Sequence, residues 1–303
     1  MILSTDTCRA DIRADLGGSV ASLQFRASRS QQWQTILRPT PAQATTGRQA
    51  GLFPLVPYSN RINQGQLHFQ QHQYQLHTED NHAIHGIGCY AAWRIIQQTD
   101  TQALLRLEHH ANRAWPWSFI AEQHFALSDQ SIRCKISMRN TGTTPCPAGI
   151  GFHPYFLIDN TTRLTATVAN VERLNQALQL EQPQQPQPAL PLHWQLNQGV
   201  KPLELVEKDL ALDHSFNGFQ GRAKLEYHDY VVNLSTSELF KHLIVYTPQA
   251  QPLCAVEPVS HCINAFNRAS NGELGTGTLV LQPNDIISGW LDIGYEQPTA
   301  VCQ

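Results

Sequence analysis

Residues 132–139 read Ile-Arg-Cys-Lys-Ile-Ser-Met-Arg, in which apolar and polar side chains alternate without a break. Successive side chains of an extended strand point to opposite faces, so this period of two predicts a half-buried antiparallel strand. The same alternation occurs at 223–228 and, interrupted by Gly289, at 286–293. Shorter candidate strands lie at 19–25, 65–76, 103–109, 164–171, 231–235 and 242–247.

Turn signals separate these segments, among them Asn140-Thr141-Gly142, Asn271-Gly272 and Pro283-Asn284-Asp285. No segment has the pattern of an amphipathic helix of three or more turns. Many short strands joined by Gly, Asn and Pro turns are typical of a sandwich or a barrel. The sequence therefore predicts an all-β fold, a large antiparallel β-sandwich.

One stretch, Glu181–Pro191, interrupts the strand pattern with four prolines and four glutamines. Such a composition is typical of a surface loop with polyproline II character, and it also occurs in linkers between domains. The strand pattern is alike on both sides of the stretch. We therefore predict a single domain over residues 1–303 with a loop excursion.

The composition excludes several classes of protein. The chain has 303 residues, 15% of them charged, with a formal net charge of −3 and no run of basic residues, which argues against nucleic-acid and membrane-surface partners. Residues 1–18 do not resemble a signal peptide, and no apolar run reaches the roughly 18 residues of a membrane-spanning helix. The seven cysteines are scattered without a Cys-x-x-Cys pair, so we expect reduced thiols in a cytoplasmic protein instead of disulfides or a zinc site.

Five segments place polar or ionisable residues inside apolar, tightly turning sequence. They are Pro-Tyr-Ser-Asn-Arg-Ile at 57–62, Ile-His-Gly at 84–86, Gly-Phe-His-Pro-Tyr-Phe at 151–156, Leu-Asp-His-Ser-Phe at 212–216 and Ala-Val-Glu-Pro-Val-Ser at 255–260. Each residue alone is compatible with a purely structural role. Together they offer an acid, a base and hydroxyl-binding groups, which a sugar site requires.

In this order, and over most of the chain, the five segments resemble the motifs of the aldose 1-epimerase (galactose mutarotase) superfamily. The run His-Pro-Tyr-Phe at 153–156 stands where the best-known members have Thr-Tyr-Phe after the motif histidine, so the chain resembles a less characterised bacterial branch. The resemblance implies a galactose mutarotase-like β-supersandwich without a metal or an organic cofactor. Its ligand would be a small-molecule sugar.

The resemblance also implies roles for two residues. Glu257 matches the general base that takes the proton of the anomeric hydroxyl, and His153 matches the general acid that protonates the ring oxygen. A carboxyl with an ordinary pKa is ionised at neutral pH, and a neighbouring anion can keep an imidazole protonated. We expect Asp213 to supply that anion.

Further residues are expected to bind the substrate. By the resemblance, Arg61, His85 and Asp213 hold sugar hydroxyls and steady the two catalytic groups. We add Asn60, from the same motif as Arg61, and Tyr155, whose ring could stack on a sugar face. Other aromatic candidates for such stacking are Phe156, Phe216 and Trp93.

Other functions fit the same residues. A hexose-6-phosphate mutarotase would need further arginines at the cleft, for which Arg94, Arg113 and Arg163 are available. A catalytically silent carbohydrate-binding module needs no acid–base pair, and a glycosidase would use Asp213 with Glu257 but leave His153 unexplained. The histidines form no recognised metal-binding pattern, so no metal is expected. The sequence makes no prediction about oligomeric state.

Overall fold

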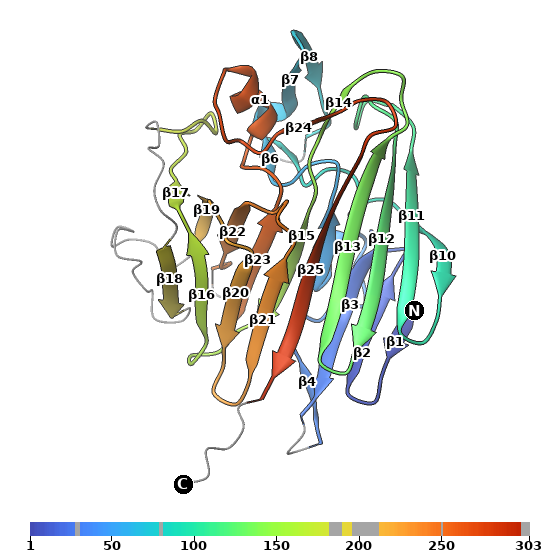
Figure 1. Ribbon diagram of the computed structural model, residues 1–303, viewed down its shortest axis with the longest axis vertical. Helices are drawn as coiled ribbons and strands as arrows, with labels where there is room; N and C mark the ends of the chain where they lie inside the picture. Colours follow the sequence, from blue (N-terminus) through green and yellow to red (C-terminus); the bar gives the residue numbers. More distant parts are fainter. Residues whose placement is uncertain (28–30, 79–80, 182–189, 196–211, 250, 298–303) are drawn as a thin grey trace.

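The computed structural model describes residues 1–27, 31–78, 81–181, 190–195, 212–249 and 251–297. Two large sheets lie one in front of the other, and short hairpins and the helix α1 gather at one end of them (Figure 1). All the strand-to-strand pairings of the described residues are antiparallel apart from one isolated bridge, Val56 with Gly86. The prediction of an all-β antiparallel sandwich is confirmed.

The first sheet has 10 strands. In spatial order they are β1 (Ile2–Ser4), β2 (Cys8–Arg13), β3 (Ser19–Arg26), β5 (Leu52–Leu55), β15 (Gly151–Leu157), β23 (Leu253–Val259), β22 (His242–Tyr246), β19 (Asp213–Asn217) and β17 (Asn170–Glu172), with β4 (Trp33–Thr35) paired to β3.

The second sheet has 9 strands. Their order is β10 (Arg94–Gln98), β11 (Gln102–His109), β12 (Phe119–Ser128), β13 (Ser131–Asn140), β25 (Ile286–Glu296), β21 (Val231–Thr236), β20 (Arg222–Glu226), β16 (Arg163–Val168) and β18 (Leu190–Gln195).

Small elements complete the fold outside the two large sheets. They are the pairs β6 (Arg61–Ile62) with β9 (Ala83–Ile84), β7 (Gln66–Phe69) with β8 (His72–Gln75) and β14 (Cys146–Ala148) with β24 (Leu279–Leu281), the helix α1 (Ala265–Ser270), and the 3-10 turns η1 (Gly47–Gln49) and η2 (Asn63–Gly65). No helix among the described residues has the length and apolarity needed to cross a membrane.

The alternating segment at 132–139 lies in β13, between β12 and β25. Its apolar residues Ile132, Cys134, Ile136 and Met138 are fully buried. On the other face, Arg133 forms an ion pair with Asp292 at 2.6 Å. The alternation of apolar and polar residues therefore predicted correctly which side chains of β13 face the core and which face solvent.

Two predicted strands are divided. The segment 65–76 forms the hairpin β7–β8, because Gln70 and Gln71 turn the chain with φ of 49° and 65°. Positive φ at both residues of a two-residue turn favours Asn and Gly, so the two glutamines gave no turn signal. The segment 164–171 is also two strands, because the chain forms β16 in the second sheet and then crosses to the first sheet, where it forms β17.

Residues 182–189 of the Pro/Gln-rich stretch lie outside the described residues, and its last two residues begin β18. β18 pairs with β16, which precedes the stretch. Strands from both sides of residues 182–189 thus share one sheet, and the single domain over residues 1–303 stays a prediction.

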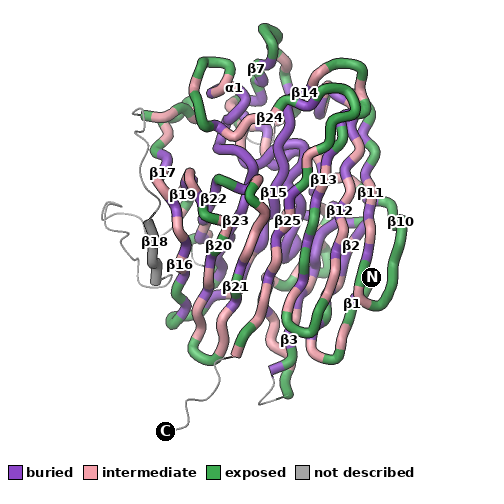
Figure 2. Tube along the Cα trace, viewed as in Figure 1, coloured by how far each residue is buried: buried purple, intermediate pink, exposed green. Residues whose placement is uncertain are grey.

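The two sheets differ in what covers their outer faces. Figure 2 shows buried residues concentrated in the middle of the molecule and exposed residues at the turns. In the first sheet, Phe152, Phe156 and Val256 belong to the main core, whereas Phe53 and Val259 belong to a second, smaller cluster. Because side chains alternate along a strand, the second cluster lies on the face turned away from the main core. The central strands of this sheet are therefore buried on both faces.

A buried ionic network holds the edge of the first sheet. The guanidinium of Arg268 in α1 lies 2.8 Å from Glu172 in β17 and 2.6 Å from Glu273. The hydroxyl of Ser215 in β19 donates to the other oxygen of Glu172 at 2.5 Å. Removing one partner would leave an uncompensated buried charge, so this network fixes α1 against β17 and β19. β19 carries Asp213, one of the predicted site residues.

Candidate active site

Three site residues stand in a row across the first sheet. His153 lies directly opposite Phe53 of β5. Gly151 pairs with Val259 and Tyr155 with Ala255, a register that places His153 opposite Glu257 of β23. Phe53, His153 and Glu257 all lie on the face turned away from the main core, where the second cluster covers them.

His153 and Glu257 form a close, buried pair. The Nε2 of His153 lies 3.0 Å from Oε1 of Glu257, and both side chains are almost fully buried. The ring of Phe53 stacks on the imidazole with centroids 4.4 Å apart, and the ring of Tyr155 lies 4.6 Å away on the same strand. These contacts fix the plane of the imidazole.

His85 reaches the pair from the loop after β9. Its ring lies edge-on to His153, with centroids 5.1 Å apart, and it is buried. The backbone of His85 has a φ of 61°, in the left-handed region that a non-glycine residue adopts at a cost. Such conformations persist where the surrounding structure imposes them and cluster at functional sites. The backbone N–H of His85 donates to the carbonyl of Asn60 at 2.9 Å, which ties this loop to the Asn60 motif.

Asn60 positions Arg61. Its Oδ1 accepts hydrogen bonds from the backbone N–H of Arg61 at 2.9 Å and from the guanidinium at 3.5 Å. The guanidinium in turn lies 3.7 Å from the carboxylate of Asp213, and both of these side chains are partly exposed. Arg61 and Asp213 therefore mark the open side of the site, and buried Asn60 lies behind them.

Burial shifts the two central pKa values in opposite directions. Loss of solvation raises the pKa of Glu257 well above its ordinary value, and the negative charge of Asp213 adds to this effect. Loss of solvation lowers the pKa of His153 well below 6.5, and positive charge on His85 and Arg38 acts in the same sense. Both shifts disfavour the charged form of the group concerned.

Three buried polar atoms of these side chains have no hydrogen-bond partner among the described residues. They are Oε2 of Glu257, Nδ1 of His153 and Nδ1 of His85. Unsatisfied buried polar atoms are uncommon in folded proteins, because each costs the free energy of its lost solvation. Their occurrence on three adjacent residues is typical of a site that binds a polar ligand.

The structure thus brings together the seven residues that the sequence predicted, with one correction. Asp213 was expected to keep His153 protonated. Asp213 forms an ion pair with Arg61, and its negative charge acts on the pKa of Glu257. The carboxylate that lies 3.0 Å from His153 is that of Glu257.

The aromatic residues that were expected to stack on a sugar lie in two different places. Tyr155 is in the site, but the guanidinium of Arg38 lies 3.8 Å from its ring centroid. Phe156, Phe216 and Trp93 are buried in the main core and do not stack on a ligand.

Sequence reasoning missed four residues in or beside the site, namely Phe53, Arg38, Arg48 and Tyr90. Phe53 supports His153 from a strand that reads as plain core. Arg38 covers Tyr155, and Arg48 donates to the hydroxyl of Tyr90 at 3.1 Å. The positive charges of Arg38 and Arg48 both act on the pKa of His153. None of the four lies in a polar motif, and only the register of the sheet and the loop packing bring them here.

The described residues contain no group of three or more His, Cys, Asp and Glu side chains placed to hold a metal ion. The chemistry that the side chains of this site offer is proton transfer.

Comparison with known proteins identifies the family of the chain. The sequence model of the aldose 1-epimerase family matches residues 3–293. The chain belongs to the aldose 1-epimerase family. Among curated relatives, the uncharacterized protein YphB of Escherichia coli K12 is 25% identical over 286 residues, which cover 86% of this chain and 89% of YphB.

Solved structures share the fold of this aldose 1-epimerase family member. A candidate aldose 1-epimerase of Escherichia coli K12 superposes with a TM-score of 0.80 at 22% identity, covering 98% of each chain. The GalM/aldose epimerase homologue of C. elegans gives a TM-score of 0.77 at 14% identity and 99% coverage of each chain. At these identities the likeness establishes the fold alone.

The titration of His153 tests the electrostatics of the site. Because burial lowers the pKa of His153, its imidazole should remain without an extra proton as the pH falls through 6.5 and gain it only well below that value. NMR of histidine-labelled protein measures this, with the signal assigned by its loss in His153→Asn. Protonation of His153 at or above pH 6.5 would contradict the described environment.

Proposed function

We propose that this chain is an aldose 1-epimerase that interconverts the α and β anomers of a free aldohexose. The observation that carries the proposal is the buried contact of 3.0 Å between Nε2 of His153 and Oε1 of Glu257, whose pKa values are shifted in opposite directions. Membership of the aldose 1-epimerase family supports it.

The reaction needs one proton removed and one delivered. Glu257, as the carboxylate, takes the proton of the anomeric hydroxyl, while His153, as the imidazolium, protonates the ring oxygen and the C1–O5 bond breaks. The open-chain aldehyde then rotates about C1–C2. Closure on its other face reverses both transfers, so the protein ends with the same number of protons as it began.

Burial makes both groups more effective in these roles. A raised pKa makes the carboxylate of Glu257 a stronger base, and a lowered pKa makes the imidazolium of His153 a stronger acid. Ring opening moves the pair from its charged form to the neutral form that the dry surroundings favour. Because burial disfavours this charged form, the reaction draws on the fraction of the protein in which Glu257 is ionised and His153 is protonated.

The remaining residues bind and orient the sugar. Arg61, Asp213 and His85 surround the pair and present donors and acceptors suited to hydroxyl groups. Asn60 acts through Arg61, whose guanidinium it contacts. Tyr155 presents the edge of its phenol ring to the sugar, because the guanidinium of Arg38 covers a face of that ring.

Removing either catalytic group should abolish most of the rate. In Glu257→Gln and His153→Asn, mutarotation of freshly dissolved α-glucose and α-galactose, followed by polarimetry, should slow by about a hundredfold to ten-thousandfold, the usual contribution of a general acid or base. Circular dichroism should show unchanged folding. If no free aldose equilibrates faster with the wild-type protein than with buffer, and sugar binding persists in both variants, the chain is a binding module.

A hexose phosphate is a second candidate substrate, favoured by two arginines. Arg38 and Arg48 lie near enough to His153 to act on its pKa, and buried Nε of Arg38 has no hydrogen-bond partner among the described residues. Of the arginines considered from sequence, Arg94 is paired with Glu108 at 3.2 Å on the edge of the second sheet. Arginines in a site are suited to phosphate recognition.

NMR exchange spectroscopy on glucose and glucose 6-phosphate discriminates the two substrates. We expect the larger kcat/KM with the neutral sugar, because Arg38 already donates to the carbonyls of Arg48 and Ala50 at 2.7 and 2.6 Å. A larger kcat/KM with glucose 6-phosphate, reduced by Arg48→Gln while that for glucose changes less, would instead establish the second candidate.

A further inference from the structure

The register of the first sheet places a further tyrosine beside the catalytic pair. β22 pairs with β23 so that Ile244 lies opposite Glu257 and Tyr246 lies opposite Ala255. Residues that lie directly opposite each other on antiparallel strands share a face of the sheet, so Tyr246 is on the face that carries the pair. Tyr246 is also the diagonal neighbour of Glu257, at a separation of roughly 7–8 Å that an aromatic side chain can span.

The row of side chains that contains Tyr246 crosses four strands. Asp213 of β19 lies opposite Tyr246, and Tyr155 of β15 lies opposite Ala255. The rings of Tyr155 and Tyr246 meet edge to face, with centroids 6.5 Å apart, and the small residue between their strands, Ala255, is fully buried. We call these four residues the tyrosine row.

Two sides of the catalytic pair are closed by buried side chains. One step along the strands from the pair, Leu55, Val259 and Ile263 belong to the buried apolar second cluster. Across the sheet towards β17, Ile244 and Ser215 are buried. A sugar placed over either region would bury hydroxyl groups against apolar surface, which costs free energy.

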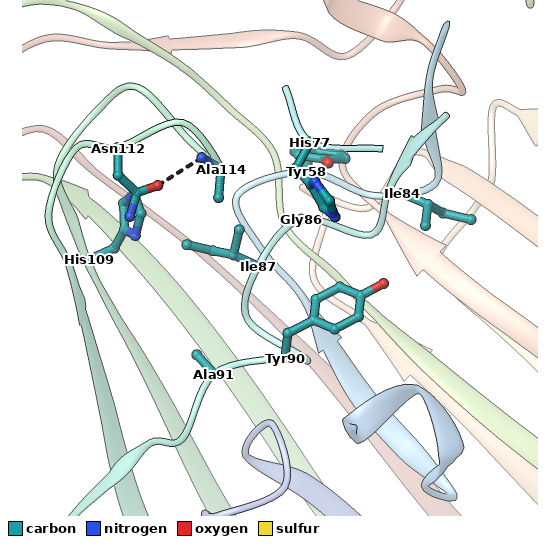
Figure 3. Close-up of a pocket in the computed structure, with 10 residues that line it drawn as sticks. All are labelled: Tyr58, His77, Ile84, Gly86, Ile87, Tyr90, Ala91, His109, Asn112 and Ala114. Carbon is teal, nitrogen blue, oxygen red and sulfur yellow. Dashed lines mark hydrogen bonds between the residues drawn. The ribbon is translucent and has the colours of Figure 1, made fainter. Parts of the chain in front are cut away.

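The third side is closed by the loop that carries His85. Phe53 and His85 are buried there, and both rings pack on His153. A pocket of about 450 Å³ lies on the other side of this loop, with residues 84, 86, 87, 90 and 91 in its lining (Figure 3). Neither His153 nor Glu257 is among the described residues that line that pocket.

The tyrosine row is the side of the pair that reaches solvent. Tyr155 and Tyr246 are partly exposed, and Asp213 is exposed. Asp213 also forms the ion pair with Arg61 at this edge of the site. A sugar whose anomeric carbon lies at the pair therefore extends its ring over the tyrosine row.

The two proton transfers decide which edge of the sugar meets Tyr246. The ring oxygen must lie at His153 on β15, and the anomeric hydroxyl must lie at Glu257 on β23. Because C5 is bonded to the ring oxygen and C2 to the anomeric carbon, the C5 edge is directed towards β15 and the C2–C3 edge towards β22. Tyr155 thus faces the C5 edge, and Tyr246 faces the hydroxyls of C2 and C3.

We propose that Tyr246 binds a hydroxyl of the C2–C3 edge of the sugar and makes the site selective for aldoses that carry this hydroxyl. The inference rests on the proposed function and deepens it, since it names a specificity-determining residue and the part of the substrate that this residue recognises. A phenol can both donate to and accept from a hydroxyl. A site built to bind a hydroxyl rejects the analogue that lacks it, because the group of the protein is left unpaired.

Deoxy sugars test this contact. The kcat/KM for anomer exchange is measured by NMR with the aldohexose that the wild type converts fastest and with its 2-deoxy, 3-deoxy and 6-deoxy analogues. Tyr246→Phe should lower kcat/KM for the parent sugar and the 6-deoxy analogue by about tenfold, equivalent to about 1.4 kcal/mol. It should leave kcat/KM unchanged for the 2-deoxy or the 3-deoxy analogue, whichever lacks the bound hydroxyl. Each sugar is compared with itself, so differences in intrinsic reactivity cancel.

A matched variant and a second measurement keep the test conclusive. Tyr295 lies in β25 of the second sheet, where its ring stacks on Phe25, so Tyr295→Phe should leave all four values unchanged. If circular dichroism shows that Tyr246→Phe does not fold, the wild type carries the test. Its rate enhancement over buffer should then be about tenfold smaller for the 2-deoxy or the 3-deoxy analogue than for the 6-deoxy analogue.

The results separate this inference from the proposed function. An equal fall for all four sugars in Tyr246→Phe, no fall for any, or the same fall in Tyr295→Phe overturns the role of Tyr246 and leaves the proposed function standing. So does an effect that disappears only with the 6-deoxy analogue, or an equal wild-type enhancement for all three analogues. Exchange no faster than in buffer with every sugar overturns the proposed function, and the role of Tyr246 with it.

Discussion

The buried contact of 3.0 Å between Nε2 of His153 and Oε1 of Glu257 is the interaction on which the rest of the site depends. It joins two neighbouring central strands of the first sheet, so its geometry follows from sheet register instead of loop conformation. The covering cluster removes water from the pair, and this loss of solvation shifts the two pKa values in opposite directions. One structural condition thus sets both the positions of the two groups and the directions of their pKa shifts.

A sheet with a chemical site on one face and the main core on the other needs strands buried on both faces. β15 meets this condition through alternation, since Phe152 and Phe156 pack into the main core while His153 and Tyr155 face the site. The second sheet needs no such coverage, and ion pairs such as Arg133 with Asp292 lie on its outer face. The candidate pair His153 and Glu257 thus lies in the sheet whose central strands are buried on both faces.

This difference also decides what could be read from sequence. Half-exposed strands such as β13 show their period of two openly, and they were predicted correctly. β5 and β23 are buried throughout, so their alternation is hidden in apolar runs and Phe53 carried no signal. The site residues were found through ordered polar motifs and a family resemblance. Residues that act by packing or long-range charge, such as Arg38 and Arg48, needed the fold, and so did the finding that Asp213 pairs with Arg61.

The central claim is that His153 and Glu257 act as one unit in opening the sugar ring. Anomer exchange at equilibrium, measured by NMR exchange spectroscopy for the wild type, Glu257→Gln, His153→Asn and the double variant, tests it most directly. Residues that act as a unit show strongly non-additive losses, so the double variant should be no slower than the worse single variant. A double variant whose rate loss equals the product of the two single losses would contradict the account.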